Sequence, residues 1–214
     1  ADSALFNINS GTGVVTFKTA PNFEAPAGGA GDDSNDYVIE VTATDDGSGT
    51  LTATQTITIT VTDANEAPSI TSASTASVAE NQTAAIDVNH TDVDGDNITY
   101  TLSGGADSAL FNINSGTGVV TFKAAPNFES AGDANTDNDY VIEVTATDDG
   151  TGTLTATQTI TITVTNVNEA PAITSASTAS VAENQTSAID VNHSDADGDT
   201  ITYTLSGGAD SALF

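Results

Sequence analysis

The sequence ADSALFNINSGTGVVTFK occupies residues 106–123, and the same run fills residues 1–18 without a change. A third copy starts at 209 and reads ADSALF as far as 214. The copies are spaced by 105 and 103 residues, whereas solenoid units span roughly 20 to 45 residues. The period therefore predicts independent domains in tandem, arranged as a linear array.

Apolar and polar residues alternate on both sides of this run, and the alternation predicts an all-β fold. Ile160, Ile162 and Val164 alternate with threonines, which gives a strand with one dry and one wet face. With a first strand inside 70–79, about seven strands form a Greek-key β-sandwich of the immunoglobulin-like kind. The same periodicity predicts the other strands at 85–90, 98–102, 110–113, 119–122, 140–147 and 155–165.

The sequence Asn-Glu-Ala-Pro at 65–68 and again at 168–171 places a proline after each long alternating run. Proline ends such runs, so these segments predict the domain boundaries. We expect the C-terminal part of a repeat at 1–67, a complete repeat at 68–170 and the N-terminal part of the next repeat at 171–214. The repeats differ in length only between Phe23 and Tyr37 and between Phe128 and Tyr140, where we predict a loop.

The chain is strongly acidic, with 30 Asp and Glu residues against Lys18 and Lys123 and a net charge of -28. This charge argues against nucleic acid and anionic membrane surfaces as partners and favours a cation. Cysteine is absent, so a metal ion is the available staple. There is no signal peptide and no apolar run near the ~20 residues of a membrane span. We expect a fragment of a longer protein that does not insert into membranes.

The acids gather at predicted strand ends and turns. Oxygen ligands drawn from several loops, without cysteine and with almost no histidine, predict a calcium site rather than a zinc site. Turn formation is the alternative, because Asp, Asn and Gly favour turns, but a turn needs only one acid. His90 and His193 are interpreted as strand-end residues. Serine is abundant, but it is not arranged with a histidine and an acid in a way that supports a catalytic nucleophile, so we expect no enzyme. The acidic segments are DANE at 63–66, DVDGD at 92–96, NFE at 127–129 and DDG at 148–150.

Five motifs follow the order of the cadherin repeat, which the sequence resembles over its whole length. They are VAEN at 78–81, DVD at 92–94, FNINSGTG at 111–118 leading to PNFE at 126–129, VTATDDG at 144–150 and DANEAP at 63–68. The junction motif is one residue shorter than in vertebrate cadherins. In this respect it resembles the bacterial cadherin-like repeats of large repetitive, RTX-type surface adhesins.

The resemblance implies calcium between successive domains, with two or three Ca²⁺ ions at each junction. Asn22, Asn127 and Asn166 stand where the family usually has Asp, and fewer charged ligands should weaken the sites. At the first junction the implied ligands are Asn22, Glu24, Asp63, Asn65 and Glu66, followed by Asp92, Asp94 and Asp148. At the second they are Glu80, Asn127, Glu129, Asn166, Asn168 and Glu169, followed by Asp195 and Asp197.

These readings lead to one leading expectation and one alternative. The leading expectation is a calcium-rigidified extender of a bacterial cell-surface adhesin, extracellular, which projects a distal binding module. The alternative is a recognition module that binds polysaccharide or mediates homophilic cell–cell adhesion. The expected partners are neighbouring identical repeats of the same chain. We also expect the part-domains at 1–67 and 171–214 to complement each other head to tail between molecules, or to belong to a longer polymer.

Overall fold

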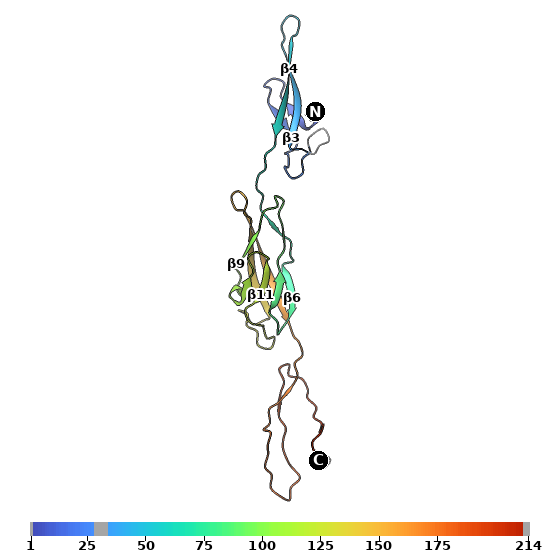
Figure 1. Ribbon diagram of the computed structural model, residues 1–214, viewed down its shortest axis with the longest axis vertical. Helices are drawn as coiled ribbons and strands as arrows, with labels where there is room; N and C mark the ends of the chain where they lie inside the picture. Colours follow the sequence, from blue (N-terminus) through green and yellow to red (C-terminus); the bar gives the residue numbers. More distant parts are fainter. Residues whose placement is uncertain (1, 28–33, 212–214) are drawn as a thin grey trace. The chain divides into compact units, whose positions relative to one another are not determined.

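The computed structural model describes residues 2–27 and 34–211 (Figure 1). Apart from the short 3₁₀ turns η1 (Ser3–Leu5) and η2 (Ser108–Leu110), its regular elements are strands. Within these residues, no helix has the length and apolar character to cross a membrane. The contacts divide the chain into two compact units. The first holds the N-terminal segment as far as Ser72 together with Asn89–Tyr100 and Thr145–Thr157, and the second holds Ala73–Val88, Thr101–Val144 and the segment from Gln158 onward.

The first unit is built from hairpins and short ladders. Strand β1 (Phe6–Ile8) pairs antiparallel with β2 (Val15–Phe17), and β3 (Asp36–Thr44) pairs antiparallel with β4 (Thr52–Thr60) along its whole length. A further short ladder joins β5 (Ser69–Ile70) to β8 (His90–Thr91). A small core forms where Phe6, Tyr37 and Ile39 are buried, with the Phe6 and Phe17 rings 4.4 Å apart.

The second unit contains the greater part of two sheets. One has the order β10 (Phe111–Ile113), β11 (Val119–Phe122), β7 (Ala84–Asp87), and the other has the order β6 (Thr75–Ala79), β13 (Thr155–Thr165), β12 (Asp139–Thr147), β9 (Thr99–Gly104). The Tyr140 ring of β12 meets Phe122 of β11 edge-on at 5.2 Å, so the sheets pack face to face. The expected seven-stranded all-β sandwich is confirmed.

Strand β12 shows why the alternation is informative. Tyr140, Ile142, Val144 and Ala146 are 0 to 2% exposed, and the residues between them are half-buried. On β13, Ile160, Ile162 and Val164 are buried in the same way. Burial of each Ile or Val side chain stabilises the folded state by roughly 1.5 to 3 kcal/mol, so these inward-facing side chains hold the sandwich together.

The predicted strand at 85–90 is wrong in one respect, because it is divided into β7 and β8. The backbone changes partner between them: Val88 N–H donates to Gly118 O at 3.1 Å, and Thr71 N–H donates to Asn89 O at 2.9 Å. A strand that passes from one ladder to another loses its continuous pairing. The predictions at 119–122 and 155–165 match β11 and β13 in full. The loop predicted between Phe128 and Tyr140 has no strand from 129 to 138, and β12 begins at Asp139.

The repeats are alike in sequence but not in burial. Strand β3 has the same sequence as β12, DYVIEVTAT, yet Ala43 is exposed where Ala146 is fully buried. After residue 171 the described strands are only β14 (Ala172–Ile173) and β15 (His193–Ser194). Figure 1 draws this orange-to-red segment largely as coil. The part of the predicted length-variable loop at 28–33 lies outside the described residues.

Candidate metal centres

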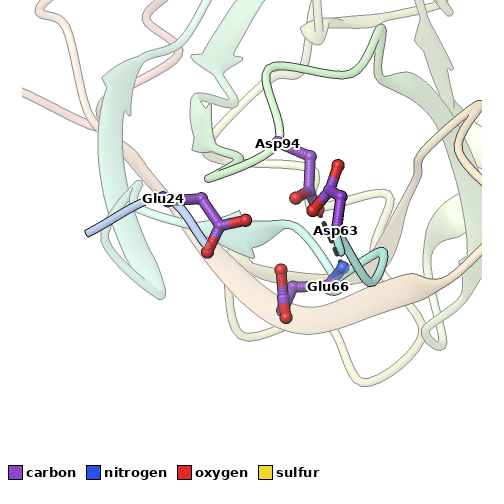
Figure 2. A group of neighbouring side chains, drawn as sticks. All are labelled: Glu24, Asp63, Glu66 and Asp94. Carbon is purple, nitrogen blue, oxygen red and sulfur yellow. Dashed lines mark hydrogen bonds between the residues drawn. The ribbon is translucent and has the colours of Figure 1, made fainter. Parts of the chain in front are cut away.

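Four acidic side chains converge in the first unit, at the predicted first junction. Glu24, Asp63, Glu66 and Asp94 each have a carboxylate oxygen within 4.8 Å of the others. Figure 2 shows them turned toward a common centre, with Glu24 from the segment after β2 and Asp94 from the loop after β8. The Glu66 N–H donates to Asp94 Oδ2 at 2.8 Å. This bond ties the segment after β4 to the acidic loop.

A second group in this unit is formed by Asp92, Asp94 and Asp96. Asp92 Oδ1 accepts hydrogen bonds from the N–H groups of Asp94, Gly95 and Asp96 at 3.0 to 3.3 Å, and this turn gathers the three acids. Asp92 Oδ2, Asp94 Oδ1 and Asp96 Oδ2 are buried and have no hydrogen-bond partner among the described residues. Burying an unpaired carboxylate oxygen is costly, and a bound cation removes that cost.

The second unit repeats this chemistry at the predicted second junction. Glu80, Glu129 and Glu169 form one group, and Asp195, Asp197 and Asp199 form another. Glu80 is 3% exposed and accepts the N–H groups of Phe128 and Val167, both at 2.8 Å. Among the described residues, the buried oxygens without a partner include Glu169 Oε2, Asp195 Oδ2 and Asp197 Oδ1. The last two are the counterparts of Asp92 Oδ2 and Asp94 Oδ1.

The loop at 148–150 packs against Asn65 and Asp96. Asn65 Nδ2 donates to Asp148 Oδ2 at 3.0 Å, and the buried Asp148 accepts the N–H groups of Gly150 and Leu154 at Oδ1. A methyl group on Gly150 would overlap Asn65 Oδ1 and Asp96 Oδ2. An alanine here would displace the ends of these two side chains.

The four remaining predicted ligands are asparagines, and each makes a hydrogen bond within the protein. Asn22 Oδ1 accepts the Ala25 N–H at 2.8 Å, and Asn127 Oδ1 accepts the Ser130 N–H at 2.6 Å, so both side chains stabilise turns. Asn168 Nδ2 lies 3.4 Å from Glu169 O. Asn166 is hydrogen-bonded to Asp197. A metal-binding role for these four asparagines, as for the acidic ligands above, stays a prediction.

Sequence reasoning missed three residues that join these groups. Asp96 and Asp199 complete the two triads, and Asn81 donates to Glu169 Oε1 at 2.6 Å. The spacing Asp-x-Asp-Gly-Asp contained the signal for the two aspartates, since the glycine lets the third acid turn back toward the first. Gly95 has a φ of +77°, which favours glycine.

The groups carry unrelieved negative charge. Desolvation raises the pKa of Glu66, and the carboxylates of Asp94, Glu24 and Asp63 raise it further. The pKa of Asp96 is raised by desolvation and then by Asp149. Desolvation also raises the pKa of Glu169, with Glu80 and Asp197 adding repulsion against the Asn81 hydrogen bond. Such a site favours a proton or a cation.

The raised pKa of Glu66 makes a prediction for the variant Glu66→Gln. An acid with a raised folded-state pKa loses stability as the pH rises from its unfolded value, 4.5, through the folded value. In chelator above that window, the variant should therefore melt at a higher temperature than the parent chain, and the difference should vanish below pH 4.5. In calcium at neutral pH the order should reverse. Thermal melts followed by circular dichroism across this pH range show which of the two chains has the higher melting temperature in each condition. A variant that also melts at the higher temperature in calcium would count against a metal role for Glu66.

The geometry can now be compared with known proteins. Residues 74–165 match the family model of the cadherin domain. The cadherin match begins one residue before β6 and ends with β13, so it covers all seven strands of the sandwich. No curated protein matches the sequence.

Solved cadherin structures share this fold. Human CDH23 EC21-23 has a TM-score of 0.57 at 20% identity, with 90% of this chain and 65% of that chain covered. Drosophila N-cadherin EC1-4 has a TM-score of 0.56 at 18% identity, with 90% of this chain and 48% of that chain covered. Protocadherin Gamma B2 extracellular cadherin domains 3-6 have a TM-score of 0.53 at 24% identity, with 79% of this chain and 41% of that chain covered. The chain spans less than two thirds of each of these solved chains.

Proposed function

We propose that the chain is a calcium-rigidified extender in which Ca²⁺ binds the two acidic groupings and fixes successive cadherin-like repeats. The recurrence of buried carboxylate oxygens without a partner at Asp92 and Asp94, and again at Asp195 and Asp197, carries this proposal. Groups of three or four carboxylates whose oxygens lie within 4.8 Å of one another suit a hard cation that takes six to eight oxygen ligands. The residues present therefore fit calcium.

The ligands at the first site come from segments far apart in the sequence. Glu24 precedes β3, Asp63 and Glu66 lie between two repeats, and Asp94 follows β8. A cation shared by these carboxylates cancels their repulsion and joins the two sides of the junction at 65–68. We propose the same role for the second grouping at 168–171, and we place the repeat boundaries at these two segments.

The finer assignment is an extracellular stalk of a bacterial surface adhesin. The repeats are nearly identical, which supports a spacer that only adds length more than it supports a recognition surface. The aromatic side chains that a sugar-binding platform would need are largely in the core: Phe111, Phe122 and Tyr140 are 2 to 4% exposed. Extracellular calcium sites bind at roughly 10⁻⁴ to 10⁻³ M, so the stalk stiffens outside the cell.

Small-angle scattering of the chain in calcium and in chelator tests this function. We expect a larger radius of gyration and a single maximum dimension in calcium, and a broad, shorter distribution in chelator. Asp94→Asn should lose much of the calcium response, because Asp94 belongs to both first-site groups. Glu40→Gln, an exposed charge on β3 outside them, is the control. Equal profiles with and without calcium would exclude the extender mechanism.

A further inference from the structure

We infer that the residue at position 63 of the first junction, and its counterpart at position 166 of the second, sets how tightly each junction binds calcium. Asp63 strengthens the binding and Asn166 weakens it, so the two junctions fill and empty at different calcium concentrations. The inference rests on the proposed function, because it concerns the same two acidic groupings. It adds a difference between them that the near-identity of the repeats conceals.

The two junctions share the same framework at three of four equivalent positions. In the first junction, the Glu66 N–H donates to Asp94 Oδ2 at 2.8 Å. In the second junction, the Glu169 N–H donates to Asp197 Oδ2 at 2.7 Å. Among the four positions only one differs, with aspartate at 63 and asparagine at 166. The three pairs of equivalent acids are Glu24 and Glu129, Glu66 and Glu169, and Asp94 and Asp197.

At the first junction the differing position carries a negative charge. Asp63 is a member of the four-acid group whose carboxylate oxygens lie within 4.8 Å of one another, and Figure 2 shows it beside Asp94 and Glu66. Desolvation is the largest cause of the raised pKa of Glu66, and Asp63 is one of the three carboxylates that raise this pKa further. Four carboxylates that converge in this way repel one another, and a divalent cation relieves the repulsion.

At the second junction the same position carries an amide that interacts with one of the acids. Hydrogen bonds from the Glu169 N–H, and then from the Asn166 side chain, lower the pKa of Asp197. The charged form of Asp197 is therefore stabilised by the protein before any cation arrives. Asp197 Oδ1 is nevertheless buried without a hydrogen-bond partner among the described residues. The second junction thus keeps a site for a cation, but with less repulsion for the cation to relieve.

An amide is a weaker calcium ligand than a carboxylate at this position. Calcium affinity depends on the number of charged ligands, and an asparagine oxygen carries no net charge. The amide must also turn its NH₂ group away from Asp197 before its oxygen can face the ion. We therefore expect the second junction to need about tenfold more calcium than the first.

Unequal junctions give the chain a graded response to calcium. As the calcium concentration falls, the ion at 168–171 leaves first, while the segment at 65–68 keeps its ion. Over that range of concentration one junction is flexible and the other is stiff. The residue at one position therefore decides where the chain bends first.

A calcium titration followed by nuclear magnetic resonance reads the two junctions separately within the 214-residue chain. The backbone amides of Glu66 and Glu169 are the reporters, because each donates to the aspartate of its own junction. In the parent chain we expect the Glu169 amide to reach its midpoint at a calcium concentration about tenfold higher than the Glu66 amide. Equal midpoints would overturn the inference. If neither amide responds to calcium, the proposed function itself is wrong.

A reciprocal pair of variants assigns the difference to this one position. Asp63→Asn should raise the calcium midpoint of the Glu66 amide about tenfold, and Asn166→Asp should lower that of the Glu169 amide by a similar factor. Each variant should leave the other junction unchanged. Ala64→Val introduces the neighbouring, uncharged difference between the junctions at an exposed residue, and it should move neither midpoint. Midpoints that ignore the charge at positions 63 and 166, or that follow Ala64→Val instead, would refute the assignment.

Discussion

Ala146→Asp should destabilise the sandwich by about 3 to 5 kcal/mol, enough to unfold much of it, because it buries a charge without a partner. Ala146 is 0% exposed on the inward face of β12. The free energy of unfolding of a domain of this size is typically about 5 to 15 kcal/mol. Urea denaturation followed by tyrosine fluorescence measures the loss.

Ala43→Asp is the matched control, since Ala43 occupies the same position of the same nine-residue sequence in β3. It is exposed, so in dilute solution we expect less than about 0.5 kcal/mol of change. Similar stability losses for the two variants in dilute solution would mean that β3 is already covered.

Calcium should raise the melting temperature of the chain by roughly 6 to 20 °C. At about 10 mM, an ion with an extracellular-type affinity contributes about 1.4 to 2.7 kcal/mol. In a domain of about 100 residues, each kcal/mol corresponds to roughly 4 to 8 °C. Differential scanning calorimetry across a calcium titration measures the shift. If the melting temperature does not change, the proposal that the chain binds calcium is wrong.

Gly150→Ala should remove about half of that shift or more, because the methyl group pushes Asn65 and Asp96 away from the first site. Gly47→Ala is its counterpart in the preceding repeat, where the nearest atom to an added methyl, Asp45 Oδ1, lies at an ordinary 3.6 Å. We expect Gly47→Ala to keep the full calcium shift. Isothermal titration should show a calcium affinity about tenfold weaker for Gly150→Ala alone.

Local periodicity predicted the strands well, because alternation directly records which face is dry. The ends of β11 and β13 and the seven-stranded sandwich followed from it. The break between β7 and β8 did not, since it depends on Gly118 and Thr71, which lie far from it in sequence. Burial of β3 was likewise beyond local reasoning: its nine residues are those of β12, and only the strands packed on it differ.

The acidic groups were predictable in part for a similar reason. Motif order brought Glu24, Asp63, Glu66 and Asp94 into one list, and the structure brings these four together in space. Asp96 was left out because the resemblance supplied only the first two acids of its loop. The contact between Gly150 and Asn65 could not be seen in sequence, since no pattern records how closely two loops approach.

The parallel pairing of β6 with β13 presents folding with a degenerate choice. Thr161 of β13 pairs with Thr75, 86 residues away, but the identical TASVA at 178–182 begins only 17 residues beyond Thr161. Loop-closure entropy favours the nearer, incorrect copy by about 1.4 kcal/mol. Local strand affinity is the same for both copies, so it cannot correct this bias. The correct choice must come from cooperative packing of the whole sandwich. Repetition of the sequence therefore slows folding, because mispaired strands have to separate first.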